Sequence, residues 1–232
     1  WWFTRLRLHS KLAVITTLVL IAAGSIFIFL FEYNNPETIG TMSFGEKLLA
    51  SLFQSVTTRT AGFYTVSQSA LHEESKLFCS ILMFIGGSPG GTAGGVKTTT
   101  LAMLFLSCLT FVRGGNDTEC MGRRISPANF RTGFCVVMAA FSAFITGTIL
   151  ILALEPDSIP LVDIIYEAAS AVGTVGLSAD LTPRLCRGSQ IVLMCMMYIG
   201  RLGPLTLVLT FAGKTHPRDK IRRLPAEQIM VG

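Results

Sequence analysis

Residues 83–100 read MFIGGSPGGTAGGVKTTT, a stretch with six glycines, one proline and one lysine between two apolar runs. Glycine-rich stretches of this kind either hold phosphate groups or interrupt helices inside membranes. A Walker A loop requires glycine directly before lysine, whereas Val96 separates Gly95 from Lys97 here. The flanking sequence also lacks the strand pattern and the acidic magnesium ligand of such a loop. We therefore expect a broken membrane helix and no nucleotide site in this chain.

The composition of the whole chain indicates a membrane protein. Of its 232 residues, 50% are hydrophobic and 14% are charged, whereas soluble domains carry about 25% charged residues. This chain has too little polar surface to cover a globule in water. We expect an all-α integral membrane protein that is not an enzyme, has no organic cofactor and binds no nucleic acid.

The apolar runs predict a membrane helix, a short half-helix and a second, broken membrane helix. The run at 12–31 is long enough to cross a hydrocarbon core of about 30 Å. The run at 47–56 is too short to cross and predicts a half-helix that enters the membrane and turns back. A polar, glycine-marked segment follows at 57–64. The next apolar run begins near residue 77, is interrupted by 86–97 and resumes at 101–112.

The same order of elements recurs in the second half of the chain. A full-length run at 133–154 precedes a half-helix at 161–172 and a glycine-marked segment at 173–178, and 191–211 is the last span. TAG at 60–62 matches TVG at 174–176, and MFIGGSPGGT from 83 matches MYIGRLGPLT from 197, both at an offset of 114. Two separated motifs at one offset indicate a tandem repeat.

We expect four parts in the chain, which are a pore repeat at 1–113, a cytoplasmic loop at 114–132, a second pore repeat at 133–213 and a cytoplasmic tail at 214–232. The charges orient these parts in the membrane. The segments 1–11, 113–131 and 214–232 hold 12 basic and four acidic residues, and the opposite side holds five basic and ten acidic ones. The positive-inside rule then predicts that both termini are cytoplasmic. The half-helices would enter from an acidic outer face, which favours cations.

The half-helices and the segments that follow them indicate a path for a cation. A half-helix that runs inward from the outer face points its negative dipole end toward the membrane centre. The Thr-x-Gly segment that follows can turn backbone carbonyls toward an axis, where they replace the hydration shell of potassium. Two ordinary re-entrant turns are the alternative, but they leave the repeated glycine unexplained.

Four motifs in order resemble the membrane subunits of Ktr/Trk potassium transporters, most closely the KtrB type. They are SVTTRTAGF, GGSPGGTAGGVKTTT, EAASAVGTVGLS and YIGRLGPLT. The resemblance implies four membrane–pore-helix–membrane repeats around one pore, of which this chain would supply the third and fourth. It also implies the two missing N-terminal repeats, a homodimer, a plasma membrane location and a cytoplasmic nucleotide-binding regulatory subunit as partners.

The resemblance assigns a potassium filter of backbone carbonyls to the two Thr-x-Gly segments. The filter residues it implies are Thr60, Ala61, Gly62, Phe63, Thr174, Val175, Gly176 and Leu177. Tyr64 replaces the asparagine that often follows the Gly-Phe pair in the family, so the outer mouth of the third filter segment departs from the pattern. Glu167, in the second half-helix, is expected to support the filter through hydrogen bonds to backbone amides rather than by contact with the ion.

The glycine-rich stretch is implied to be an intramembrane gate below the filter. The gate residues are Gly86, Gly87, Ser88, Pro89, Gly90, Gly91, Gly94, Gly95 and Lys97, together with Arg201. Each glycine lowers helix stability by about 1 kcal/mol and a proline removes a backbone donor, so such a segment can adopt two arrangements of similar free energy.

Lys97 and Arg201 are costly charges inside a membrane. Lys97 either faces the pore, which we favour, or extends to the cytoplasm. Arg201, at the position equivalent to Gly87, is expected in the middle of the last span. It either forms a constriction, as the resemblance suggests, or binds loop carbonyls.

The transported ion is expected to be potassium, with sodium as the second candidate. The alternative function is a secondary, sodium-coupled cation symporter whose binding site lies between broken helices. Repeats that each cross the membrane an even number of times favour the channel-like architecture. The basic segments at 113–131 and 214–232 are expected to contact lipid head groups or a protein partner.

Overall fold

A computed structural model describes residues 6–91, 93–115, 117–156, 158–203 and 206. The described chain is helical apart from one two-stranded hairpin. Its elements in order are α2 (Leu8–Glu32), α3 (Phe44–Thr57), α4 (Glu73–Phe84), α5 (Thr98–Val112), β1 (Glu119–Cys120), β2 (Arg123–Arg124), α6 (Pro127–Leu154), α7 (Leu161–Gly173), the 3-10 turn η1 (Thr182–Arg184) and α8 (Arg187–Leu202).

Two helices of the described chain are long and apolar enough to cross a membrane, Leu8–Glu32 and Ala128–Leu154. They correspond to the expected spans at 12–31 and 133–154. Large apolar side chains on these helices, such as Leu18 and Ile149, are exposed, which suits surfaces that face lipid or neighbouring membrane helices. The fold is therefore that of the all-α membrane protein predicted from the sequence.

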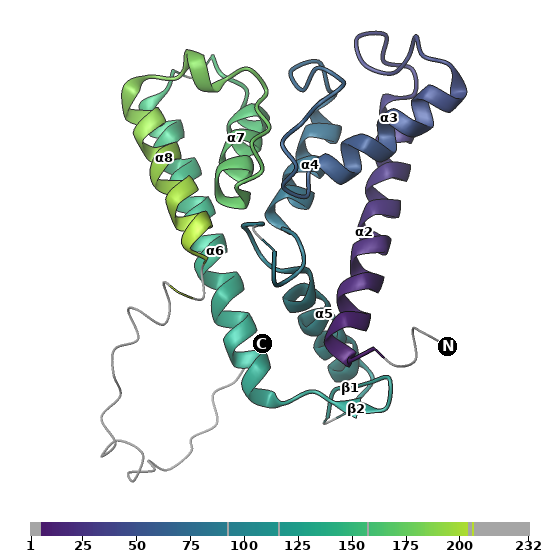
Figure 1. Cartoon of the computed structure of the whole chain (residues 1–232). Helices are drawn as coiled ribbons and strands as arrows, with labels where there is room; N and C mark the ends of the chain where they lie inside the picture. Colours follow the sequence, from purple (N-terminus) through teal and green to yellow (C-terminus); the bar gives the residue numbers. More distant parts are fainter. Residues whose placement is uncertain (1–5, 92, 116, 157, 204–205, 207–232) are drawn as a thin grey trace.

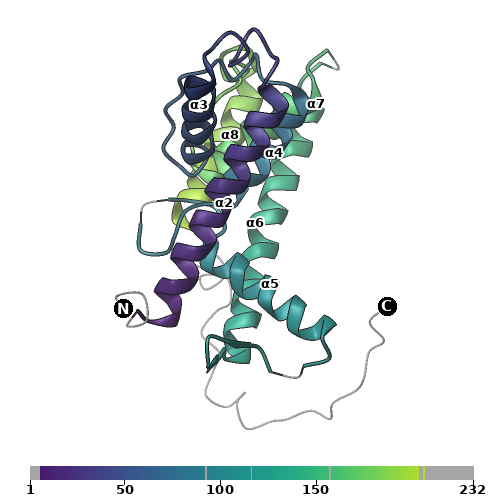
Figure 2. The same cartoon turned by 90° about the vertical axis from the view of Figure 1, so that its right-hand side faces the viewer.

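Each long helix carries a short helix and a second helix beside it (Figure 1). Helix α2 packs against α3, α4 and α5, and α6 packs against α5, α7 and α8. The short helices α3 and α7 lie at the end of the molecule opposite the β1–β2 hairpin, as Figure 2 also shows. The contact of α4 with α7 joins the two halves.

The buried core lies where the two halves meet. One cluster contains Ile28 of α2, Cys79 and Met83 of α4, and Tyr166 of α7. Val175, which follows α7 in the chain, belongs to the same cluster. The side chain of Tyr166 is fully buried, with an exposed fraction of 0%. The chain that follows α7 is thus held by core packing rather than left as a surface loop.

Local sequence signals set the bounds of the short helices. Ser43 and Glu46 form a capping box at the start of α3, in which the Glu46 carboxylate accepts from the Ser43 amide at 2.8 Å. This cap satisfies free N–H groups of the first turn and explains why α3 begins before residue 47. Helix α7 ends where Thr174 adopts a left-handed conformation, with φ of 52°.

Two expectations differ from the structure. The loop expected at 114–132 contains the β1–β2 hairpin, in which Glu119 pairs with Arg124, and α6 already begins at Pro127. The last span, expected at 191–211, begins earlier, because α8 runs from Arg187 to Leu202; residues 204–205 and 207–211 lie outside the described residues. The basic tail at 214–232 lies outside the described residues.

Candidate functional site

The two Thr-x-Gly segments lie side by side, directly after α3 and α7. Thr60 and Gly62 have φ of 71° and 77°, and Thr174 and Gly176 have φ of 52° and 91°. A side chain disfavours this conformation, so the two threonines adopt it at a cost. A Cβ on Gly62 would lie 2.6 Å from the Val175 carbonyl oxygen. The two segments therefore share an alternating backbone conformation and approach each other closely at Gly62.

The backbone amides of these segments are tied back to the half-helices. Val175 donates to the Ser170 carbonyl at 2.9 Å, and Ala61 donates to the Thr57 carbonyl at 3.1 Å. The Thr57 hydroxyl in turn donates to the Phe63 carbonyl. Each segment thus continues a half-helix whose negative dipole end points into it.

The carbonyl oxygens of the same segments have few partners. Within the described part of the chain, no hydrogen bond reaches the carbonyl oxygens of the other predicted filter residues, which are Thr60, Ala61, Gly62, Thr174, Val175, Gly176 and Leu177. Unpaired carbonyls at this depth are tolerated where they line a watery path, and rings of them are ligands for a dehydrated monovalent cation. The segments can therefore coordinate a cation.

Glu167 of α7 lies behind the second segment. Its Oε1 accepts from the Ala179 amide at 3.0 Å and from the Ser178 hydroxyl at 2.5 Å. Its Oε2 accepts from the Thr182 hydroxyl at 2.8 Å. Glu167 as a residue is 4% exposed, so these three donors satisfy a buried charge. They join α7 to the chain that leaves the second Thr-x-Gly segment.

A second polar contact lies behind the first segment. Gln54 of α3 donates from Nε2 to Oε1 of Gln68 at 2.5 Å, and the Tyr166 hydroxyl donates to the same oxygen at 2.7 Å. All three side chains are buried. Each half-helix is therefore bonded through its own side chain to the chain beyond its Thr-x-Gly segment, and Tyr166 links the two halves.

The glycine-rich loop between α4 and α5 folds back on itself. Ile85 and Val96 form a parallel bridge, and the Val96 amide donates to the Phe84 carbonyl at 3.0 Å. A Cβ on Gly86 would collide with the Gly94 carbonyl oxygen. The described residues of this loop, 86–91 and 93–97, are called the gate loop below. Its two ends are in contact, so the gate loop is a compact unit rather than an extended linker.

The tip of the gate loop reaches α2. The Ser88 hydroxyl lies 3.2 Å from the Thr17 hydroxyl and 3.3 Å from the Thr98 hydroxyl. Gly90 has φ of 94°, which a side chain disfavours. Gly91 is exposed. Ser88 thus attaches the loop to the first long helix, and glycine permits the turn beyond it.

Two further bonds attach the gate loop to the Thr-x-Gly segments. Arg59, the residue before Thr60, donates from Nη2 to the Gly86 carbonyl at 3.3 Å. The Gly94 amide donates to the Thr174 hydroxyl at 3.1 Å. The gate loop therefore contacts both Thr-x-Gly segments, which the sequence order does not reveal.

Lys97 and Arg201 line one cavity of about 310 Å³, together with Gly94 and Gly203. The Lys97 ammonium donates to the Ala93 carbonyl within the gate loop. Arg201 lies in the last turn of α8, and residues 204–205 and 207–211 of the expected span lie outside the described residues. Gly203, which follows α8, has φ of 82°. The structure brings these two cations together beside the loop.

Sequence reasoning missed Arg59. It was counted among the charges of the outer face, yet its guanidinium is half-buried beside the gate loop. The available signal was its position, because a charge directly before Thr-Ala-Gly lies in a segment expected inside the membrane, where charges require a partner.

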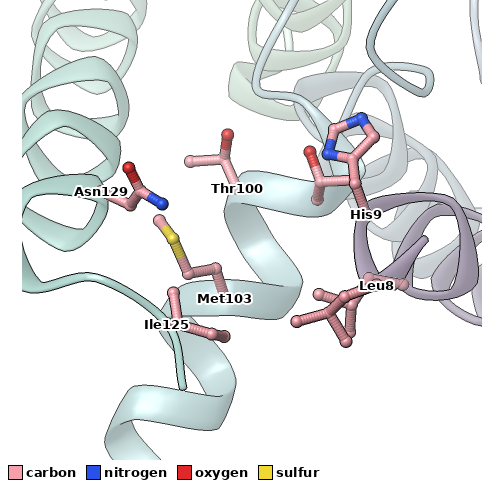
Figure 3. Close-up of a pocket in the computed structure, with 8 residues that line it drawn as sticks. Leu8, His9, Thr100, Met103, Ile125 and Asn129 are labelled. Carbon is pink, nitrogen blue, oxygen red and sulfur yellow. The ribbon is translucent and has the colours of Figure 1, made fainter. Parts of the chain in front are cut away.

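A cavity of about 200 Å³ lies at the end with the hairpin, between the first turns of α2, α5 and α6 (Figure 3). Its polar side chains include His9, Thr100 and Asn129. None of the predicted filter or gate residues lines it. This cavity is separate from the Thr-x-Gly segments.

Known proteins are similar to this chain in sequence and in fold. The Ktr system potassium uptake protein B of Bacillus subtilis is 36% identical over 215 residues, which are 90% of this chain and 47% of that protein. The potassium/sodium uptake protein NtpJ of Enterococcus hirae is 34% identical, over 98% of this chain and 51% of that protein. The crystal structure of the potassium transporter TrkH from Vibrio parahaemolyticus matches with a TM-score of 0.65 at 21% identity, over 86% of this chain and 44% of that one.

The chain spans about half the length of the curated relatives it matches. The family model described as TrkH, a cation transport protein, matches residues 3–224. With that match and the relatives above, the chain belongs to the TrkH family of cation transport proteins, as the four sequence motifs suggested.

Proposed function

We propose that this chain forms half of the wall of a potassium pathway across the plasma membrane, as the second half of a longer polypeptide. The observation that carries the proposal is the pair of adjacent Thr-x-Gly segments with unpaired carbonyl oxygens. Such oxygens can replace the water around potassium. The relatives named above as potassium uptake proteins support the choice of ion.

The proposed filter consists of the eight residues 60–63 and 174–177. Glu167 holds the second segment in place through its three hydrogen bonds. The first two repeats of the full-length protein supply the other half of the ring. Further partners of the proposal are a second copy of the protein, a cytoplasmic nucleotide-binding regulatory subunit and the lipid membrane, with both termini of the chain on the cytoplasmic side.

The gate loop blocks or opens the path below the filter in this proposal. Its contacts with both Thr-x-Gly segments support the assignment. Lys97 and Arg201, which line one cavity beside it, add positive charge that opposes a cation until the loop moves. Sodium is the second candidate ion, because the Enterococcus hirae relative is named for potassium and sodium.

Two glycine substitutions test the filter. In the full-length parent protein, Gly62→Ser places a side chain against the Val175 carbonyl and at a positive φ, and Gly176→Ser strains the equivalent position. Each strained residue costs about 1–3 kcal/mol, which is sufficient to distort the carbonyl geometry. We expect both variants to lose potassium affinity and potassium-over-sodium selectivity by about tenfold or more, measured as uptake into a transport-deficient bacterial strain.

The matched control is Gly45→Ser, because a Cβ at Gly45 meets nothing within 4 Å and needs no positive φ. This variant should transport like the unchanged protein. Unaltered affinity and selectivity in both filter variants would refute the assignment. A slow, saturating flux with a fixed sodium stoichiometry would favour the symporter instead.

A further inference from the structure

Arg59, the residue directly before the first Thr-x-Gly segment, contacts the gate loop. It follows the C-terminal cap of α3 and precedes Thr60, whose φ is 71°. Its Nη2 donates to the Gly86 carbonyl at 3.3 Å. Its Nη1 is buried and, among the described residues, has no hydrogen-bond partner. A half-buried guanidinium with one buried donor left unpaired costs free energy, so packing alone does not account for it.

We infer that Arg59 is a positioning residue that holds the gate loop against the filter, so that the loop and the filter move together. The inference rests on the proposed function of the filter and the gate loop. It adds a residue that neither the predicted filter nor the predicted gate included, although it lies within the motif SVTTRTAGF.

The position of Arg59 favours this role over that of an ordinary ion pair. Its positive charge lies at the carbonyl end of α3, where the helix dipole stabilises a cation. No carboxylate among the described residues forms a salt bridge with it. Its printed partner is a backbone carbonyl at the first residue of the gate loop. The side chain therefore recognises the position of the loop backbone rather than another charge.

A second bond makes the attachment two-sided. The Gly94 amide donates to the Thr174 hydroxyl at 3.1 Å. Gly86 and Gly94 are so close that a Cβ on Gly86 would collide with the Gly94 carbonyl oxygen. The bonds at Arg59 and at Thr174 therefore restrain one compact unit from two sides, and a displacement that breaks one of them disturbs the other.

The consequence is that filter and gate are coupled. Arg59 is covalently joined to Thr60, and Thr174 is itself a predicted filter residue. Release of the gate loop frees both side chains and removes a restraint from each of the two segments. Movement of the loop should then alter the selectivity of the filter as well as the rate of flux.

The test uses the full-length parent protein in proteoliposomes, with rubidium as a tracer for potassium. Arg59→Gln removes the charge and the forked donors. Loss of this hydrogen bond to a charged group should raise resting rubidium flux about tenfold or more. The same variant should lower the preference for potassium over sodium. Arg59→Lys keeps the charge without the planar fork. Its flux and selectivity should therefore lie between those of Arg59→Gln and of the unchanged protein.

Thr174→Val breaks the second bond without a large change in side-chain volume and should raise the resting flux in the same way. Because both bonds restrain one unit, the increase in resting flux of the double variant should be smaller than the product of the increases of the two single variants. The matched control is Arg184→Gln, which removes an exposed arginine from the turn after the second segment and should leave flux and selectivity unchanged.

A readout that does not depend on conduction separates this inference from the proposed function. Ala93 is half-buried against Gly87 within the gate loop, and Ala93→Cys gives a thiol whose labelling rate reports release of the loop. Arg59→Gln should increase that rate about tenfold relative to the same cysteine in the unchanged background. Absence of rubidium flux in the parent protein would overturn the proposed function, while labelling would still report on Arg59. Equal labelling and equal selectivity with and without Arg59 would overturn the inference.

Discussion

At the scale of single residues, backbone conformation carries the most information about the site. Thr60 and Thr174 hold positive φ angles at equivalent positions, each followed two residues later by a glycine with positive φ. The TAG and TVG motifs predicted this pairing from sequence, because glycine is the residue that adopts such angles freely. The sequence could not predict which group Arg59 contacts, since its partner Gly86 lies 27 residues away.

Glu167 offers a test of how a buried carboxylate supports the second filter segment. Glu167→Gln removes the charge from an acceptor of three hydrogen bonds, so at least one donor loses its partner. We expect a loss of stability of about 1–3 kcal/mol and a lower potassium-over-sodium selectivity, measured as thermal unfolding in detergent and as competitive uptake.

The control for Glu167 is Glu37→Gln, which changes an exposed side chain in the loop after α2. It should alter neither the unfolding temperature nor the selectivity. A Glu167→Gln protein that matches the parent in both measurements would show that the three hydrogen bonds do not support the filter.

At the scale of elements, the lengths of apolar runs and the positions of proline and glycine predicted the helices. The contacts between elements could not be predicted from the sequence. The half-helix expected at 161–172 is observed as Leu161–Gly173, because Pro160 and the glycines that follow mark both ends. The last span begins at Arg187 instead of residue 191, because Arg187, Gly188 and Ser189 are helical although a hydropathy pattern does not register them. The hairpin at 119–124 was missed since strands of two residues have no periodicity.

The contact between α4 and α7 includes an ion pair that the sequence did not indicate. Lys76 Nζ lies 2.7 Å from Asp163 Oδ1, and the two side chains are 9% and 19% exposed. Removal of one partner leaves a largely buried charge unpaired. We expect Lys76→Met to destabilise the protein by about 1–3 kcal/mol after allowance for solvent screening, measured by thermal unfolding.

A double-mutant cycle tests whether this ion pair joins the two halves. Lys76→Met combined with Asp163→Leu should recover most of the lost stability, because no unpaired charge remains. The control pair is Asp117 and Arg124, at 2.6 Å but 46% and 61% exposed. Arg124→Met should lower the free energy of unfolding by less than about 1 kcal/mol. Additive effects at Lys76 and Asp163 would contradict the coupling.

At the scale of the whole molecule, the number of filter segments decides whether the chain can conduct. The described chain contains two Thr-x-Gly segments, and it spans about half the length of its curated relatives. A ring of carbonyls that replaces a hydration shell must surround the ion. Two adjacent segments leave one side of the pathway open, and exposed apolar side chains such as Leu49 of α3 and Met194 of α8 are available to pack against further repeats.

We therefore expect this chain, expressed alone in a strain that lacks potassium uptake, to support no uptake as a monomer. The full-length parent should restore growth at low potassium, and co-expression of its first half with this chain should restore part of it by completing the ring. Cross-linking in membranes identifies the species that forms in each case. If copies pair, four segments become available and uptake should follow the dimer fraction. Potassium-selective uptake by the monomeric chain would mean that a ring of four segments is not required, and the filter assignment would have to be abandoned.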